Sequence, residues 1–115
     1  MGVEGELLRN LRSFFSSAEL VRGRGEHTGA FILFFKSLLA LCDYVLLTKG
    51  KGLPKDHSER FRSLEKHFPD MYREVDYLFK YYQQSYSTSV RKEVCDEAKK
   101  SVVLFAKNFG IKVVE

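Results

Sequence analysis

One segment constrains the fold more than any other. Residues 30–47 are almost entirely apolar, yet they include the charged residues Lys36 and Asp43. The segment is nearly long enough to span a bilayer. A charge at the bilayer centre costs about 2.5–3.5 kcal/mol, which makes two of them unfavourable in a transmembrane helix. We therefore expect a helix with neighbours on nearly every side, at the centre of a small all-helical bundle, and no membrane insertion.

The chain has 115 residues, enough for one hydrophobic core, so we expect residues 1–115 to form a single domain. It does not open with a basic stretch followed by an apolar run, so we expect no signal peptide and a cytoplasmic location. Cys42 and Cys95 form no metal-binding pair. We expect both to pack as free, small hydrophobic residues, with an interhelix disulfide as the alternative. The net charge of +4 permits contact with nucleic acid without requiring it.

Apolar residues recur at spacings of three and four on both sides of the central segment, which predicts further amphipathic helices. We expect helices over residues 6–21, 28–48, 70–83 and about 90–109, with a short helix that starts near residue 56. No segment of useful length alternates with period two, so we expect no sheet. The predicted fold is all-α: an antiparallel up-and-down bundle of four long helices plus one short helix.

Residue types at the predicted helix ends support these boundaries. Thr28 suits the N-cap of the central helix, and the serine-rich segment 85–89 suits the N-cap of the last one. Asp56 and Glu59 have the spacing of a capping box, so the short helix should start there. Gly50 suits the left-handed position that follows a helix.

The central helix is more apolar than a bundle of this size needs, because a bundle helix usually keeps one wet face. Either the short helix covers that face or a second subunit does. We expect a homodimer through this helix or its neighbour.

No strong catalytic motif is present. The histidines His27, His57 and His67 do not pair with each other or with cysteine at metal-ligand spacing, so we expect no metal and no cofactor. Tyrosines gather between residues 72 and 86, beside Lys80 and two glutamines. Such tyrosines stack on nucleobases and hydrogen-bond to them. The candidate binding residues are His57, Tyr82, Gln83 and Tyr86. The alternative is that the tyrosines are core or interface aromatics with a wet hydroxyl.

The order of features resembles a known family. An apolar helix that ends in Leu-Leu-Thr-Lys-Gly precedes a stretch reading Leu-Pro-Lys-Asp-His-Ser at residues 53–58. A helix then leads into Tyr-Gln-Gln-Ser-Tyr at residues 82–86, and an alanine-containing helix follows. Over about residues 5–110 the chain resembles the HEPN-domain proteins, small helical bundles of prokaryotes that are often encoded beside a minimal nucleotidyltransferase. The resemblance implies a cytoplasmic homodimer of the toxin–antitoxin type, with RNA, nucleotide or a nucleotidyltransferase as partner.

Active members of that family are metal-independent endoribonucleases with an arginine four to six residues before a histidine. The arginine holds the scissile phosphate and the histidine moves the proton of the attacking hydroxyl. The principal candidates by spacing are Arg62 with His67; the other matches are Arg22 with His27 and Arg60 with His67.

The chain also departs from the family pattern. The family usually places the motif near the start of its last long helix, where this chain has Arg91 without a following histidine. Gln83 or Gln84 stands where related proteins often have arginine. We therefore expect a binding module for nucleotide, RNA or a nucleotidyltransferase, without catalysis of its own. The alternatives are a toxin-like ribonuclease acting across a dimer cleft and a purely structural protein-interaction module.

Overall fold

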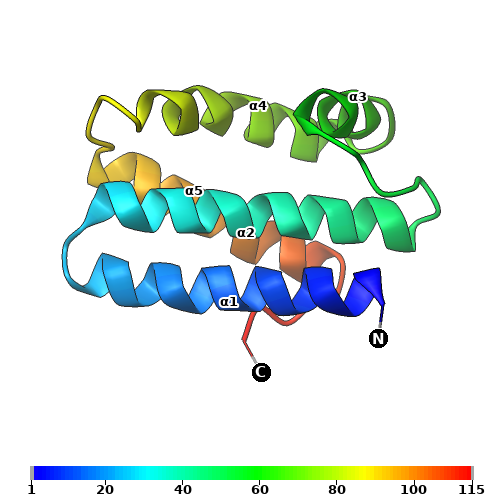
Figure 1. Ribbon diagram of the computed structural model, residues 1–115, viewed down its shortest axis with the longest axis horizontal. Helices are drawn as coiled ribbons and strands as arrows, with labels where there is room; N and C mark the ends of the chain where they lie inside the picture. Colours follow the sequence, from blue (N-terminus) through cyan, green and yellow to red (C-terminus); the bar gives the residue numbers. More distant parts are fainter. Residues whose placement is uncertain (1, 115) are drawn as a thin grey trace.

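The computed structural model describes residues 2–114, and this part of the chain holds five helices and no strand. They are α1 (Val3–Gly23), α2 (His27–Thr48), α3 (His57–His67), α4 (Pro69–Gln84) and α5 (Lys92–Asn108). Helix α2 forms the middle layer, with α1 on one side, α3 and α4 on the other, and α5 crossing behind it (Figure 1). The predicted all-α bundle of four long helices and one short helix is confirmed.

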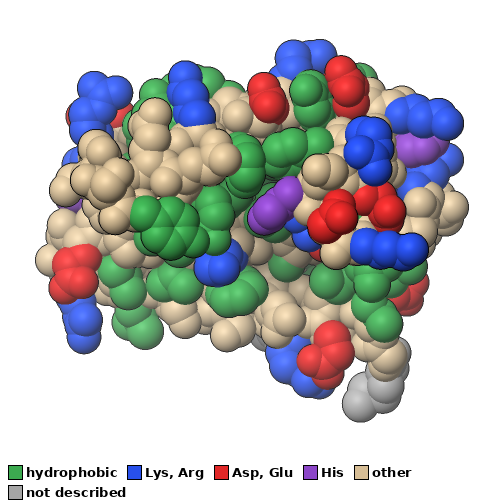
Figure 2. Space-filling view, turned by 45° about the horizontal axis from the view of Figure 1, so that its top comes forward, with side chains coloured by type: hydrophobic (Ala, Val, Ile, Leu, Met, Phe, Trp, Pro, Cys, Tyr) green, Lys and Arg blue, Asp and Glu red, His purple; other side chains and the backbone are tan. Residues whose placement is uncertain are grey.

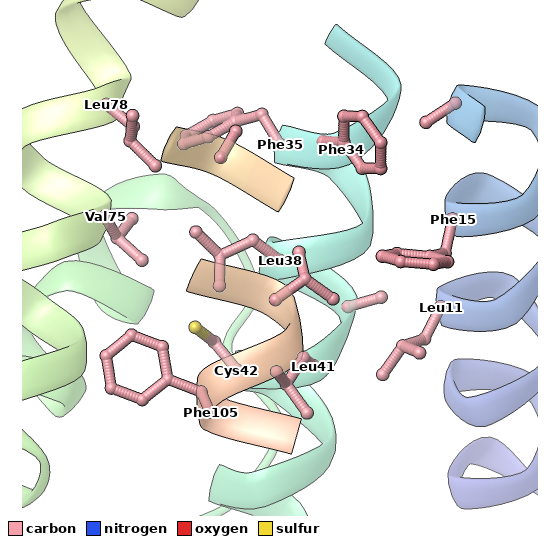
Figure 3. Packing of buried hydrophobic residues seen from close by; sticks show 14 of the residues in the cluster. Leu11, Phe15, Phe34, Phe35, Leu38, Leu41, Cys42, Val75, Leu78 and Phe105 are labelled. Atoms are coloured by element: carbon pink, nitrogen blue, oxygen red, sulfur yellow. The ribbon is translucent and has the colours of Figure 1, made fainter. Parts of the chain in front are cut away.

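Helix α2 is the centre of the hydrophobic core. It contacts each of the other four helices, and twelve of its residues are buried. Phe34, Leu38 and Leu41 of α2 lie among the side chains of α1, α4 and α5 (Figure 3). By length and composition alone α2 passes as a membrane-spanning helix. Its burial by α1, α3, α4 and α5 accounts for its apolar character within one chain, so that character does not itself require a second subunit.

Glycine ends α2 as the sequence predicts. Gly50 has φ of 78°, in the left-handed region that suits glycine. Its N–H donates to the Leu47 carbonyl at 3.1 Å, and the N–H of Lys51 donates to the Leu46 carbonyl at 2.8 Å. This pair of bonds is a Schellman motif, which satisfies carbonyls that the helix end would leave without partners.

Two predicted N-caps are wrong. Helix α2 has Glu26 at its N-cap, and the Thr28 hydroxyl instead accepts a hydrogen bond from the N–H of Val90 at 2.8 Å. Helix α5 has Arg91 at its N-cap, without a side-chain cap, so the serine-rich loop supplies none. Thr28 thus ties the start of α2 to the segment that enters α5. The Thr28 hydroxyl therefore makes a long-range hydrogen bond in place of the predicted local cap.

The two cysteines are buried free thiols, Cys42 in α2 and Cys95 in α5. The expectation of free cysteines that pack as small hydrophobic residues is therefore confirmed.

Candidate binding site

The first turn of α3 fixes the polar part of the site. The Asp56 carboxylate caps this helix by accepting from the N–H of Glu59 at 2.9 Å. The Glu59 carboxylate accepts from the N–H of Lys55 at 3.1 Å, one residue before the position that a standard capping box uses. His57 and Arg60 follow the cap at a spacing of three, which puts both on the same side of the helix.

Arg60 forms a buried ion pair with Asp43 of α2. Its Nε donates to Asp43 Oδ1 at 2.7 Å, and its Nη2 donates to Oδ2 at 2.9 Å. The two side chains are only 13% and 10% exposed. Two parallel hydrogen bonds between a guanidinium and a carboxylate fix the geometry as well as the charge. The pair fastens α3 to α2 and explains why an aspartate can occupy an apolar helix.

The same guanidinium orients the imidazole of His57. Arg60 Nη1 lies 2.8 Å from His57 Nδ1, and a guanidinium only donates hydrogen bonds. We therefore assign the neutral tautomer in which Nδ1 accepts and Nε2 carries the proton. Burial and the nearby Arg60 charge lower the pKa of His57. At neutral pH the imidazole is a hydrogen-bond donor through Nε2 and has no free nitrogen with which to act as a base.

An aromatic row continues from His57 along α4; it consists of His57, Phe79, Tyr82 and Tyr86. The His57 ring lies 5.3 Å from the Phe79 ring, the Phe79 ring 6.3 Å from Tyr82, and Tyr82 lies 6.2 Å from Tyr86. Tyr82 also stacks on Phe35 of α2 at 5.0 Å, which anchors the row in the core. Figure 2 shows hydrophobic side chains gathered on this face, with histidine and basic side chains among them.

His57 and Tyr86, at the two ends of the row, are exposed, whereas Phe79 and Tyr82 between them are partly buried. Tyr86 is 83% exposed, and the turn that carries it is fixed by a hydrogen bond from the Ser85 hydroxyl to the Tyr82 carbonyl at 2.6 Å. A side-chain hydrogen bond with Tyr82 raises the pKa of the Tyr86 phenol, so this phenol stays neutral. Gln83 is exposed beside the row, four residues after Phe79, where its amide is open to a ligand.

Lys36 of α2 supplies a positive charge beneath the row. Its Nζ lies 5.8 Å from the centroid of the Tyr82 ring, a cation–π distance. Because Asp43 neutralises Arg60, the ammonium of Lys36 carries the positive charge that this face offers to an anion. The site thus combines stacking surfaces, a fixed N–H donor and one cation.

The structure separates the tyrosines that the sequence groups together. Tyr77 and Tyr81 form their own pair, with ring centroids 5.6 Å apart and Lys80 Nζ about 5 Å from each ring. By the helical repeat, Tyr81 lies about 100° and Tyr77 about 140° around α4 from Tyr82. Of the tyrosines between residues 72 and 86, Tyr82 and Tyr86 are the two in the aromatic row.

The structure does not bring the nuclease candidates together within one chain. Arg62 and His67 are five positions apart on α3, which turns them about 140° from each other around the helix. Burial and the charges of Lys51 and Lys66 lower the pKa of His67, which lies at the far end of α3 from His57.

The arginine and histidine of the two other spacing matches do not form a site either. Arg22 donates to Asp96 of α5 at 2.9 Å, whereas His27 begins α2. Arg60 shares a face with His67 but is engaged with Asp43 and His57.

The sequence did not predict two parts of the site: the ion pair of Arg60 with Asp43, and the ammonium of Lys36. A usable signal was present. Lys36 and Asp43 are seven positions apart, so they lie on one face of α2, and a charge in an apolar helix needs a partner on the helix packed there. Which arginine is that partner depends on how α3 packs, and sequence spacing does not contain this information.

Among residues 2–114 there is no group of three or more His, Cys, Asp or Glu side chains arranged to hold a metal ion. Comparison of the chain with known protein families, with curated proteins and with solved structures finds no match.

Proposed function

We propose that this protein is a HEPN-like helical module that binds a nucleotide or single-stranded RNA on the aromatic row, without catalysis of its own. The observation that carries the proposal is the juxtaposition of the exposed Tyr86 ring, the Nε2–H donor of His57 and the ammonium of Lys36 on one face. A nucleotide offers a matching set of groups: a flat base, hydrogen-bond acceptors and a phosphate.

Each group has a separate role in this proposal. A base stacks against Tyr86, whose ring is supported from behind by Tyr82. His57 donates from Nε2 to a base or ribose oxygen, and Arg60 holds its ring in place. Lys36 attracts the phosphate, so binding should weaken as salt rises. Gln83 adds an amide that can hydrogen-bond to the edge of the base.

The neutral tautomer of His57 favours binding over cleavage. A general base for RNA cleavage needs an unprotonated nitrogen directed at the 2′-hydroxyl. In His57 the unprotonated nitrogen is already occupied by Arg60. Homodimerisation and pairing with a nucleotidyltransferase belong to the same proposal through the family resemblance.

Fluorescence anisotropy with a fluorescein-labelled oligouridylate, and competition by ATP, tests the site. Stacking contributes about 1–3 kcal/mol per base, so Tyr86→Ala should weaken binding by about 5- to 150-fold. Tyr86→Phe keeps the ring and should bind within about threefold of wild type. Lys36→Met should lower the slope of log affinity against log salt by about 0.7.

The matched control is Tyr77→Ala, because Tyr77 is an exposed tyrosine of α4 that lies outside the aromatic row. Equal losses in Tyr77→Ala and Tyr86→Ala, or unchanged binding in Tyr86→Ala, would place the ligand elsewhere. A wild-type protein that binds neither oligouridylate nor ATP would remove the proposed function.

A further inference from the structure

The outward face of α5 carries a second surface that the proposed function does not use. A shallow hollow of about 590 Å³ lies on this face and is lined by α5 residues together with Arg22 of α1. Its apolar part is Val103 and Leu104, which are 42% and 54% exposed. Helix α5 crosses behind α2 (Figure 1), whereas the aromatic row runs from α3 along α4 into the loop after α4.

The rim of this hollow is basic. Lys99, Lys100 and Lys107 all line it, and Lys99 pairs with Glu19 of α1 at 2.9 Å, so Lys100 and Lys107 supply the excess positive charge. Asp96 is the one acid among the described residues that line it, and that carboxylate already pairs with Arg22 at 2.9 Å and with Lys92 at 3.1 Å. The surface therefore presents two aliphatic side chains inside a surplus of positive charge.

We propose that this hollow docks an acidic amphipathic helix of a partner protein. The lining residues run from Asp96 to Lys107 along α5, a length of about 16 Å, which equals three turns of a helix laid alongside. Leucine side chains of the partner would pack on Val103 and Leu104, and its flanking glutamates or aspartates would face Lys100 and Lys107. The charges of the two surfaces are then complementary, which favours fast and selective association.

The composition of the hollow favours a protein over RNA. Single-stranded RNA binds through aromatic rings that stack on its bases, and the described residues that line this hollow are aliphatic or charged. Two aliphatic side chains also give too little apolar area for insertion into a membrane surface. The proposal does not depend on nucleotide binding at the aromatic row.

The probe is a synthetic helical peptide of about four turns, with leucines on one face and glutamates beside them, labelled for fluorescence anisotropy. A second peptide carries lysine in place of each glutamate. We expect the wild-type protein to bind the acidic peptide at least tenfold more tightly than the basic one. Leu104→Glu, and separately Lys100→Glu with Lys107→Glu, should each weaken binding of the acidic peptide by tenfold or more.

The control variant is Leu53→Glu, which places the same charge on an exposed leucine of the α2–α3 loop and should leave binding unchanged. Circular dichroism melting confirms that each variant folds. The proposal fails if the two peptides bind equally, if the acidic peptide does not bind, or if Leu104→Glu has no effect. It also fails if the double lysine variant loses oligouridylate binding while Leu104→Glu keeps it, because the surface would then contact RNA. Tyr86→Ala should leave peptide binding intact. Failure of the docking proposal can therefore be distinguished from failure of the nucleotide-binding proposal.

Discussion

Replacing Arg60 alone should destabilise the protein severely, because it leaves the Asp43 carboxylate buried without a partner. Breaking a buried ion pair by removing one member costs about 3–5 kcal/mol. Asp43 is 10% exposed and accepts two hydrogen bonds from Arg60, so Arg60→Met should fall within that range. Domains of this size have a total stability of about 5–15 kcal/mol, so the loss is a large fraction of it.

The matched variant replaces both members, Asp43→Leu together with Arg60→Met. Apolar replacement of a whole buried ion pair is often neutral or stabilising, so the double variant should unfold within about 1 kcal/mol of wild type. At roughly 4 °C per kcal/mol for a domain near this size, Arg60→Met should lower Tm by about 12–20 °C, whereas the double variant should stay near the wild-type Tm.

Urea unfolding followed by circular dichroism, with the m-value checked for each variant, measures these free energies. The reasoning would be refuted if Arg60→Met cost less than about 1 kcal/mol, because water would then already screen the pair. The double variant has a second use. It keeps the fold but removes the group that orients His57, so it should bind oligouridylate more weakly than wild type at unchanged stability.

Three further predictions concern groups elsewhere in the bundle. Burial and a hydrogen bond with Glu97 raise the pKa of Glu74 above the ordinary value of 4.5, so the stability from this pair is present at low pH and is lost as pH rises through the folded-state pKa. Glu97→Gln should therefore raise Tm at pH 8 and leave it unchanged at pH 4, and the opposite order would contradict the sign. Burial raises the pKa of Cys95 to about 11 and also raises the pKa of Cys42. Neither thiol should therefore react with Ellman's reagent until denaturant is added. Fast labelling of the native protein would contradict this prediction, because it would show that the thiols are accessible. The purified protein should not cleave labelled RNA in EDTA, and cleavage that His67→Ala abolishes would instead establish a ribonuclease.

The fold was predictable because its signals are local and repeated. The spacing of apolar residues predicts the four long helices, and the capping-box spacing of Asp56 and Glu59 predicts the short one. Gly50 ends its helix by short-range hydrogen bonds. The predicted caps at Thr28 and at the serine-rich loop failed for the opposite reason. The Thr28 hydroxyl accepts a hydrogen bond from the N–H of Val90, which is 62 positions away in the chain. A local sequence pattern cannot predict a contact between residues so far apart.

The candidate site was predictable in part. An exposed tyrosine next to glutamines indicates Tyr82, Gln83 and Tyr86, and the structure places Tyr82 and Tyr86 in one row with His57. The state of the imidazole was not predictable. It depends on Arg60, whose position is fixed by Asp43 on another helix, so the tautomer of His57 follows from how α2 and α3 pack.

The most direct test of nucleotide binding on the aromatic row uses the three histidines as reporters. The side-chain nitrogens of His27, His57 and His67 can be followed by NMR in protein labelled with nitrogen-15, before and after oligouridylate is added. The free protein should show His57 as the Nε2–H tautomer, and the RNA should shift its resonances while those of His27 and His67 stay in place. Resonances of His57 that do not move, or a shift confined to His67, would contradict binding at this site.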